Sequence, residues 1–431
     1  MTTHDQDQLI QCIQPARLED RLRQLYVLGQ KPGHRGAWRL AFSAADRRGR
    51  DYVGDLMRQS GLEPRVDAAG NLIGARSGEN RGLPAIIIGS HIDTVPGGGM
   101  FDGALGVIGG VEVLAAVNEA GVKLNHPVEV IAFSNEERSR FATNFSGSAA
   151  MVGGASASDL DDVYDQAGVP LVTAMQESGL DPGAVATAHR PTGFCRAYLE
   201  LHVEQGGRLL KSGDQIGVVT AIVGITRARL TFRGFANHAG TTMLEDRRDA
   251  LWPAAALVGV VREAALAQAG ELVGTVGQLE VQPGAANVVP GEVTLTIELR
   301  SAAEERLAAT LAALLARAEQ LAAEYGVELT VSSSRVGPPV PLDPAMQDHV
   351  EAAGRALGLR TVRLASWAGH DASEFAGGVP TGMIFVPSQG GISHSPRELT
   401  TWPDAVAGVK VLAATLLRVD RHLSDGAAAK R

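Results

Sequence analysis

The sequence predicts an α/β fold: a doubly wound, mostly parallel sheet into which a smaller α+β unit is inserted. Apolar runs at residues 83–90 and 128–134 have the composition of buried parallel strands, and residues 104–120 between them have the length of a crossover helix. This order is typical of a doubly wound sheet, whose ligands gather outside the carboxyl ends of the strands. We expect two further strands of the same kind at residues 197–203 and 383–387.

A different pattern begins near residue 223 and predicts the inserted unit. Residues 226–234 alternate like a half-exposed antiparallel strand. The segments that follow predict, in order, a helix at 247–269, strands at 272–281 and 292–300, a helix at 302–325 and a strand at 327–333. Together they form a βαββαβ unit of domain size. We therefore expect a discontinuous large domain, residues 1–221 and 336–431, around a small domain, residues 222–335.

Charge and composition exclude several classes of protein. The 431 residues carry a formal net charge of −9 with no long basic run, so we expect no nucleic-acid partner. The apolar stretches are interrupted well short of a membrane span and no export signal is visible, so we expect a cytoplasmic protein without membrane attachment. Cys12 and Cys195 lie far apart without metal-binding spacing, which indicates a reducing compartment.

The first candidate site residues follow the strand at 83–90. His91 and Asp93 lie at its carboxyl end, and Asp102 follows after a Gly-rich turn. Alternation places His91 and Asp93 on one side, so that Asp93 can orient the His91 ring while the other ring nitrogen faces a metal. The alternative is a surface His beside a turn Asp, because such short matches are common by chance.

Glu136 and Glu137 follow the strand at 128–134. Adjacent carboxylates raise each other's pKa, and a cation resolves the repulsion if one carboxylate binds it while the other moves a proton. The alternative is an acidic pair at a helix N-terminus, stabilised by the helix dipole.

Two later histidines complete the set. His202 lies in the strand at 197–203, where alternation places Glu204 on the same face and turns Gln205 to the other face or into the loop. His394 lies in a Gly-rich loop after the last predicted strand. An ordinary buried core residue is the alternative for His202.

Three histidines and two carboxylates from four strand ends predict a site for two divalent metal ions, with Asp102 as the bridge. Each metal keeps an open position for a shared hydroxide, as in catalytic rather than structural zinc sites. Zinc suits these ligands, and manganese, cobalt and nickel suit them too.

Nine motifs in this order resemble the N-carbamoyl-L-amino-acid hydrolase family, which includes bacterial allantoate amidohydrolases and a branch of β-ureidopropionases and is related to zinc aminoacylases. The motifs are GSHIDT, GGMFDGALGV, FSNEE, ELHVEQG, FANHAGTT, NVVPG, ELR, AGHDAS and GGISHSP. The resemblance implies one metal held by His91, Asp102 and His202 and a second held by Asp102, Glu137 and His394.

The resemblance also implies the catalytic groups. Glu136 would be the general base that takes a proton from the metal-bridging water and delivers it to the leaving nitrogen. His238 would help to stabilise the oxyanion from the neighbouring subunit, because in this family the small domain supplies the dimer contact. An obligate homodimer is therefore expected.

The substrate-binding group implied by the resemblance consists of Gln205, Asn287 and Arg300, with Gly369 and His370 in a loop near the substrate. Arg300 and Asn287 would grip the substrate carboxylate, a task that suits a planar guanidinium. The alternative for Arg300 is an ordinary surface ion pair.

His202 indicates the carbamoyl branch, since relatives that cleave peptides or simple acylamino acids generally carry an acidic ligand there. Two departures concern specificity. Residues 138–148 (RSRFATNFSGS) differ from the commoner pattern GSRFGTTLLGS, and Trp367 stands where Gly is usual before AGHD. We expect both to border the substrate pocket.

The activity implied is hydrolysis of an N-carbamoyl-L-amino acid to the L-amino acid, carbon dioxide and ammonia. Alternatives on the same site are hydrolysis of allantoate, of a β-ureidopropionate or of an N-acyl amino acid. A non-catalytic binding protein is a further alternative, but it would not need Glu136 beside a metal ligand.

Overall fold

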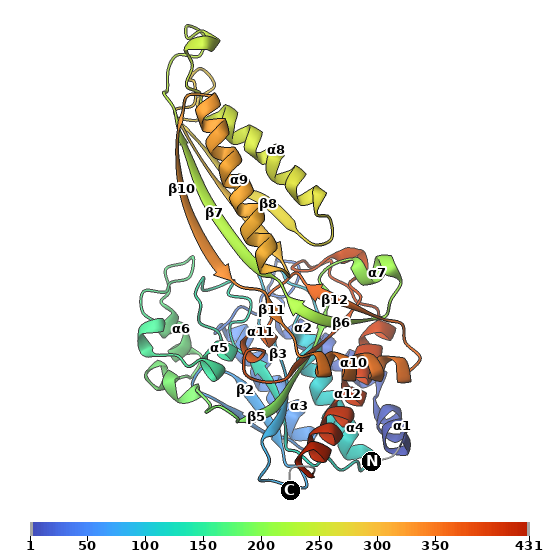
Figure 1. The fold of residues 1–431 in the computed structure, drawn as a ribbon. Helices are drawn as coiled ribbons and strands as arrows, with labels where there is room; N and C mark the ends of the chain where they lie inside the picture. Colours follow the sequence, from blue (N-terminus) through green and yellow to red (C-terminus); the bar gives the residue numbers. More distant parts are fainter. Residues whose placement is uncertain (1–2, 429–431) are drawn as a thin grey trace. The chain divides into compact units, whose positions relative to one another are not determined.

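The computed structural model describes residues 3–428 as two compact units (Figure 1). The large unit takes in the described residues up to Thr220 and from Leu342 onward, and the small unit is Ala221–Pro341. The chain is a mixed α/β protein with a mainly parallel central sheet and a separate antiparallel sheet. No helix among the described residues is long and apolar enough to cross a membrane.

The main sheet has a parallel centre. Its order is β1-β2-β4-β3-β5-β13-β6-β11, with β12 paired to β6. The strands are β1 (Glu63–Val66), β2 (Leu72–Arg76), β3 (Ala85–His91), β4 (Val128–Phe133), β5 (Cys195–Val203), β6 (Ile216–Ile222), β11 (Val340–Pro341), β12 (Thr361–Ser366) and β13 (Thr381–Val386). Strands β4, β3, β5 and β13 are parallel neighbours, so their carboxyl ends meet at one edge of the sheet. The four strands predicted from apolar runs are these four.

Helix α4 forms the centre of the core on one face of this sheet. Residues 104–117 of α4 (Ala104–Glu119) are all buried, as expected for a helix that is apolar all round. It packs against β3 and β5, and α12 (Trp402–Ala428) packs against β5, β13 and α4. The other helices of the large unit are α1 (Thr3–Cys12), α2 (Pro15–Leu28), α3 (Ala44–Gln59), α5 (Gly147–Val152), α6 (Leu171–Glu177), α7 (Arg208–Ser212), α10 (Pro344–Ala356) and α11 (Ala372–Phe375).

Alternation along β5 separates this core from the polar side of the sheet. Leu199 and Leu201 belong to the core cluster that contains α4 and α12. Tyr198, two positions from Glu200, points to the opposite face, where its ring stacks on Phe375 of α11 with centroids 4.2 Å apart. Glu200 and His202 share the face of Tyr198, so β5 carries polar side chains under α11.

The small unit has the element order β7 (Gly224–Arg233), α8 (Leu251–Ala267), β8 (Val273–Gln282), β9 (Glu292–Ser301), α9 (Glu304–Glu324) and β10 (Glu328–Gly337). Its antiparallel sheet runs β10-β7-β9-β8, and both helices pack on it (Figure 1). Burial along β9 alternates strictly, which matches a sheet with one covered face. Helix α8 begins four residues later than predicted, because residues 244–246 form a 3-10 turn and the Asp249 carboxylate accepts a hydrogen bond from the Leu251 N–H.

Candidate metal centre

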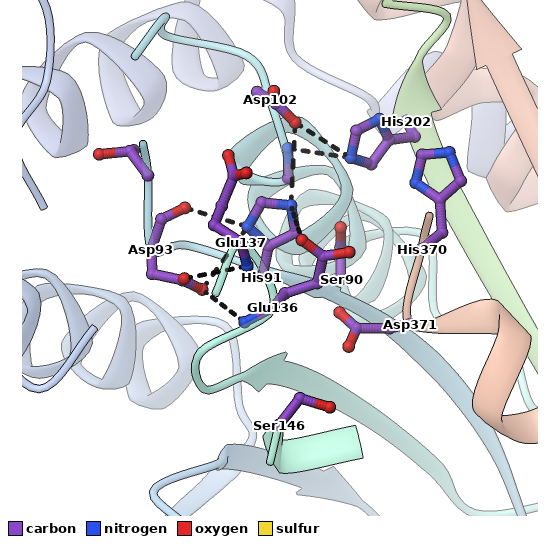
Figure 2. Close-up of polar contacts among 12 residues, drawn as sticks. Ser90, His91, Asp93, Asp102, Glu136, Glu137, Ser146, His202, His370 and Asp371 are labelled. Carbon is purple, nitrogen blue, oxygen red and sulfur yellow. Dashed lines mark hydrogen bonds and ion pairs between the residues drawn. The ribbon is translucent and has the colours of Figure 1, made fainter. Parts of the chain in front are cut away.

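Five side chains converge at the carboxyl ends of the parallel strands. Figure 2 shows four of them, His91, Asp102, Glu137 and His202. His91 ends β3, Asp102 lies in the following loop, Glu137 follows β4, His202 lies near the end of β5 and His394 follows β13. The Asp102 Oδ1 atom lies 3.3 Å from His202 Nε2 and 3.8 Å from His91 Nε2. The His394 Nε2 atom lies 3.3 Å from Asp102 Oδ2 and 3.2 Å from Glu137 Oε2.

The five side chains form two groups that share Asp102. The possible ligand atoms of His91, Asp102 and His202 all lie within 4.8 Å of one another, and so do those of Asp102, Glu137 and His394. One oxygen of the Asp102 carboxylate faces each group, which is the arrangement that a bridging ligand needs. The structure thus brings together the residues named above as metal ligands.

The two buried imidazoles are oriented by backbone carbonyls. His91 Nδ1 donates to the Asp93 carbonyl at 3.0 Å, and His202 Nδ1 donates to the Val203 carbonyl at 2.9 Å. Because a carbonyl oxygen can only accept, the neutral tautomer of each ring carries its proton on Nδ1 and presents an unprotonated Nε2 toward Asp102. Burial lowers the pKa of His202 to about 4, so its ring is neutral near pH 7, as a metal ligand must be.

The carboxylates of the cluster favour a bound cation. Burial, together with the charges of Asp102 and Glu136, raises the pKa of Glu137 well above its usual range. Burial raises the pKa of Glu136 to about 8, with added repulsion from Asp93 and Asp102. Burial also acts to raise the pKa of Asp102, but the His394 hydrogen bond and the adjacent His202 and His91 rings outweigh it and lower that pKa. A divalent cation would offset this repulsion, so the donor set fits divalent metal binding.

Gly103 allows the Asp102 loop to lie against the His91 ring. Its φ is 62°, and a Cβ atom at this position would lie 2.4 Å from His91 Nε2. Any larger residue would displace the imidazole or the loop, since both are buried.

Asp93 acts differently from the prediction. The expected carboxylate contact with the His91 ring is 3.7 Å long, and the Asp93 carbonyl orients the ring instead. The Asp93 carboxylate accepts from the Glu136 and Glu137 N–H groups, each at 3.3 Å (Figure 2). Asp93 therefore ties the loop after β3 to the loop that carries both glutamates.

Glu204 departs from the alternation argument, whereas Gln205 lies in the loop after β5, one of the two places expected for it. Gln205 lies in the site, where its Nε2 donates to Asp102 Oδ2 at 3.0 Å. The Glu204 carboxylate instead accepts from the Arg208 and Leu209 N–H groups at the start of α7. The chain leaves the extended conformation at Gln205, whose φ is 59°, so strand alternation no longer applies there.

His370 lies beside His202, whereas Gly369 is exposed. The His370 and His202 rings meet edge to face with centroids 4.5 Å apart, and His370 Nε2 lies 2.8 Å from the Ser366 hydroxyl. Burial lowers the pKa of His370 well below its usual range, so this ring is neutral and available for hydrogen bonding.

Sequence reasoning missed two buried acids beneath the cluster. Glu200 accepts hydrogen bonds from Ser90, Tyr198 and the Ala372 N–H, and Asp371 accepts one from Ser148 at 2.6 Å. Burial raises the pKa of both carboxyls well above the usual range. Both lie within motifs quoted above, and Glu200 is two residues from His202, so alternation was the available signal.

Glu398 is a third missed residue and lies outside every quoted motif. Its carboxylate accepts from the Phe101 N–H at 2.8 Å, the Asp102 N–H at 3.1 Å and the Ser393 hydroxyl at 2.7 Å. It thereby joins the loop that carries Asp102 to the loop that carries His394. Nothing in the local sequence indicated this role.

Backbone strain is concentrated in the loops of this site. Among residues 3–428, six non-glycine residues have positive φ, and four of them belong to these loops: Asn135, Arg138, Gln205 and His394. Such conformations cost free energy, and they persist where the surrounding structure requires them, often at functional sites.

The remaining candidates lie in the small unit. His238 and Asn287 are exposed and lie on adjacent segments, since the Ala239 N–H donates to the Asn287 carbonyl at 3.0 Å. Arg300 Nε donates to Glu298 at 2.8 Å, and 31% of its side chain is exposed. This is the ion pair that was considered as the alternative for Arg300. Among the arginines whose side chains the structure describes, Arg39 is the most deeply buried, and it donates to the Ile92 carbonyl between His91 and Asp93.

Comparisons with known proteins find relatives over most of the chain. The profile of the peptidase family M20/M25/M40 matches residues 87–418. The chain is 42% identical to an N-carbamoyl-L-amino acid amidohydrolase from Geobacillus stearothermophilus, covering 94% of this chain and 98% of that protein. It is 35% identical to an allantoate amidohydrolase from Bacillus subtilis, covering 84% and 88%. A crystal structure of a hydantoinase/carbamoylase family amidase from Burkholderia multivorans superposes with a TM-score of 0.86 at 34% identity, covering 94% and 98%.

Proposed function

Because this chain belongs to the peptidase family M20/M25/M40, we propose that it hydrolyses N-carbamoyl-L-amino acids to the L-amino acid, carbon dioxide and ammonia. The observation that carries the proposal is the pair of ligand groups that share Asp102, with Glu136 beside them. The 42% identity to a carbamoyl amidohydrolase favours this substrate over allantoate, whose amidohydrolase is 35% identical.

Two divalent metal ions would be held by His91, Asp102 and His202 and by Asp102, Glu137 and His394. Zinc suits this donor set, with manganese, cobalt and nickel as alternatives. When bound, such ions supply Lewis-acid polarisation of the carbonyl group and lower the pKa of water.

Glu136 is the group that moves the proton. Its Oε2 lies 3.7 Å from His91 Nε2, so its carboxylate borders the ligand cluster, while its backbone is held by Asp93. It accepts a proton as water attacks the carbamoyl carbon and passes this proton to the leaving nitrogen when the C–N bond breaks. The released carbamic acid then decomposes to carbon dioxide and ammonia.

The substrate is held by Gln205, Asn287 and Arg300, with Gly369 and His370 beside it. Gln205 already donates to Asp102, so its amide lies at the metal site. The Arg300 guanidinium suits a carboxylate, and it must exchange its Glu298 partner for the substrate or hold both.

Arg300→Ala is expected to raise KM for carbamoyl amino acids by roughly 10- to 100-fold, because a charge-assisted hydrogen bond to the carboxylate is lost. Steady-state kinetics of wild type and variant measure this change in KM. Arg227→Ala is the matched control, since Arg227 pairs with the same Glu298 at 2.7 Å. A KM that stays at the wild-type value in Arg300→Ala would remove this role.

The small unit is the lid and dimerisation domain, and its His238 completes the site of a neighbouring subunit in a homodimer. His238 is exposed, and its Nδ1 accepts from the Gly240 and Thr241 N–H groups. Its Nε2 is therefore the ring nitrogen that would donate to the oxyanion in the neighbouring site.

Mixing inactive Glu136→Gln and His238→Ala proteins is expected to restore activity, because some mixed dimers contain one site with both groups intact. The activity of the mixture after subunit exchange measures this, and each variant alone is the control. Absence of rescue in mixtures that demonstrably contain heterodimers would contradict a shared site.

The proposed activity is tested with metal-reconstituted protein and a panel of N-carbamoyl-L-amino acids, allantoate, a β-ureidopropionate and N-acetyl amino acids. We expect amino-acid product from the carbamoyl substrates at higher kcat/KM than from the others. A higher value for allantoate or for an acyl amino acid would reassign the substrate.

A further inference from the structure

Arg138 occupies a strained position beside the proposed general base. It lies two residues after Glu136, and its φ is 49°, in the left-handed region that L side chains rarely adopt. Glycine adopts this conformation without strain and begins the commoner pattern at this position, as noted above. Because Arg138 adopts a conformation suited to glycine, the strain at this position indicates a functional role for its charged side chain.

The guanidinium of Arg138 is only partly engaged. Its Nη2 lies 3.8 Å from Glu374 Oε1, which is beyond hydrogen-bond distance, and 40% of the side chain is exposed. Its Nε has no hydrogen-bond partner among the described residues. Arg140 in the same segment differs, since it donates to Asp165 at 3.1 Å and to the Ala41 carbonyl at 3.0 Å. Arg140 therefore supports the loop, whereas Arg138 keeps donors to spare.

Arg138 also lies at the border of the metal centre. It leaves the loop that carries Glu136 and reaches Glu374 of α11, which follows His370 and Asp371 directly. The result is a partly exposed cation that extends from the segment just after the proposed general base toward α11.

We propose that Arg138 binds a second anionic group of the substrate, so that N-carbamoyl amino acids whose side chain ends in a carboxylate are preferred. This inference rests on the proposed function and adds the side-chain class. A guanidinium offers paired donors that match a carboxylate, and the weakly held Glu374 is the group that such a carboxylate displaces.

The test compares two matched substrate pairs: the N-carbamoyl derivatives of L-glutamate and L-glutamine, and those of L-aspartate and L-asparagine. Within a pair only the side-chain carboxylate is replaced by an amide of the same shape. The measured quantity is the acid-to-amide ratio of kcat/KM, followed by the appearance of the free amino acid. For wild type we expect a ratio of roughly ten or more in at least one pair, mainly through KM.

Three variants test the contributions of the Arg138 charge, its paired donors and the competing Glu374 carboxylate. Arg138→Gly suits the native φ and is expected to bring the ratio down to about one. Arg138→Lys keeps the charge without the paired donors and is expected to give an intermediate ratio. Glu374→Gln removes the competing carboxylate and is expected to raise the ratio. Arg355→Gln, which removes the charge of a remote exposed arginine paired with Glu351, is the control and should leave it unchanged.

A wild-type ratio of one or less in both pairs, or a ratio that Arg138→Gly does not change, would overturn the inference while the carbamoyl activity stands. If the protein releases no amino acid from the four substrates and none from any other carbamoyl amino acid, the proposed function is overturned as well. Calorimetric titration of the four compounds into Glu136→Gln provides a readout without turnover. There, the acids should bind more tightly than the amides.

Discussion

Glu136→Gln is expected to lower kcat by roughly 100- to 10,000-fold or more, because an amide cannot accept the proton of the attacking water. The substitution keeps the shape of the side chain and leaves the backbone contacts to Asp93 intact. The loss should appear mainly in kcat, since substrate contacts are unchanged.

The control for this variant is its metal content, which should equal that of wild type because Glu136 belongs to neither ligand group. Glu137→Gln should behave differently and lose metal, although the two residues are adjacent. If Glu136→Gln turned over substrate at the wild-type rate with full metal content, another group would have to be the base.

Asp102→Asn is expected to abolish measurable activity and to reduce binding at both metal positions. Asp102 is the one residue common to both ligand groups, and each of its oxygens faces a different group. Elemental analysis after reconstitution measures the loss. Thermal unfolding gives a second readout, because an ion that binds only the folded state raises the Tm, and the variant should gain little from added metal.

Asp55→Asn is a suitable comparison for Asp102→Asn, since Asp55 is an exposed residue paired with Arg58 on α3. It should bind metal and respond to it as wild type does. Full metal content in Asp102→Asn would mean that the shared carboxylate is not required, and the two-group description of the site would need revision.

The candidate ligands were predictable from sequence for a physical reason. His91, Glu137, His202 and His394 each lie at or just beyond the end of an apolar run, and adjacent parallel strands bring their carboxyl ends together. Periodicity within each run is a local property, so the four central strands and most of the small unit could be predicted without tertiary contacts. The strands β1, β2, β6, β11 and β12 were not predicted. Strands β1, β2 and β11 have at most five residues, whereas β6 is as long as β3 and was missed despite its apolar run.

The roles of several side chains depended on how loops are packed. The sequence alone placed Asp93 beside His91, but only the fold shows that its carbonyl orients the ring while its carboxylate holds the loop of Glu136. Strand alternation failed at Glu204, whose carboxylate accepts from N–H groups at the start of α7. The contact of Glu398 with the Asp102 N–H joins residues 296 positions apart, which no local pattern can reveal.

By itself, then, the sequence determined which residue types stand at the strand ends, and hence the two-metal hypothesis and the four strands that support it. The tertiary structure alone decided which oxygen of Asp102 faces which group, which acids lie buried beneath the cluster, and that Arg138 is held at positive φ beside Glu136. The difference arises because strand periodicity is imposed by nearest neighbours, whereas loop dihedral angles and long-range hydrogen bonds are imposed by the packing of distant segments.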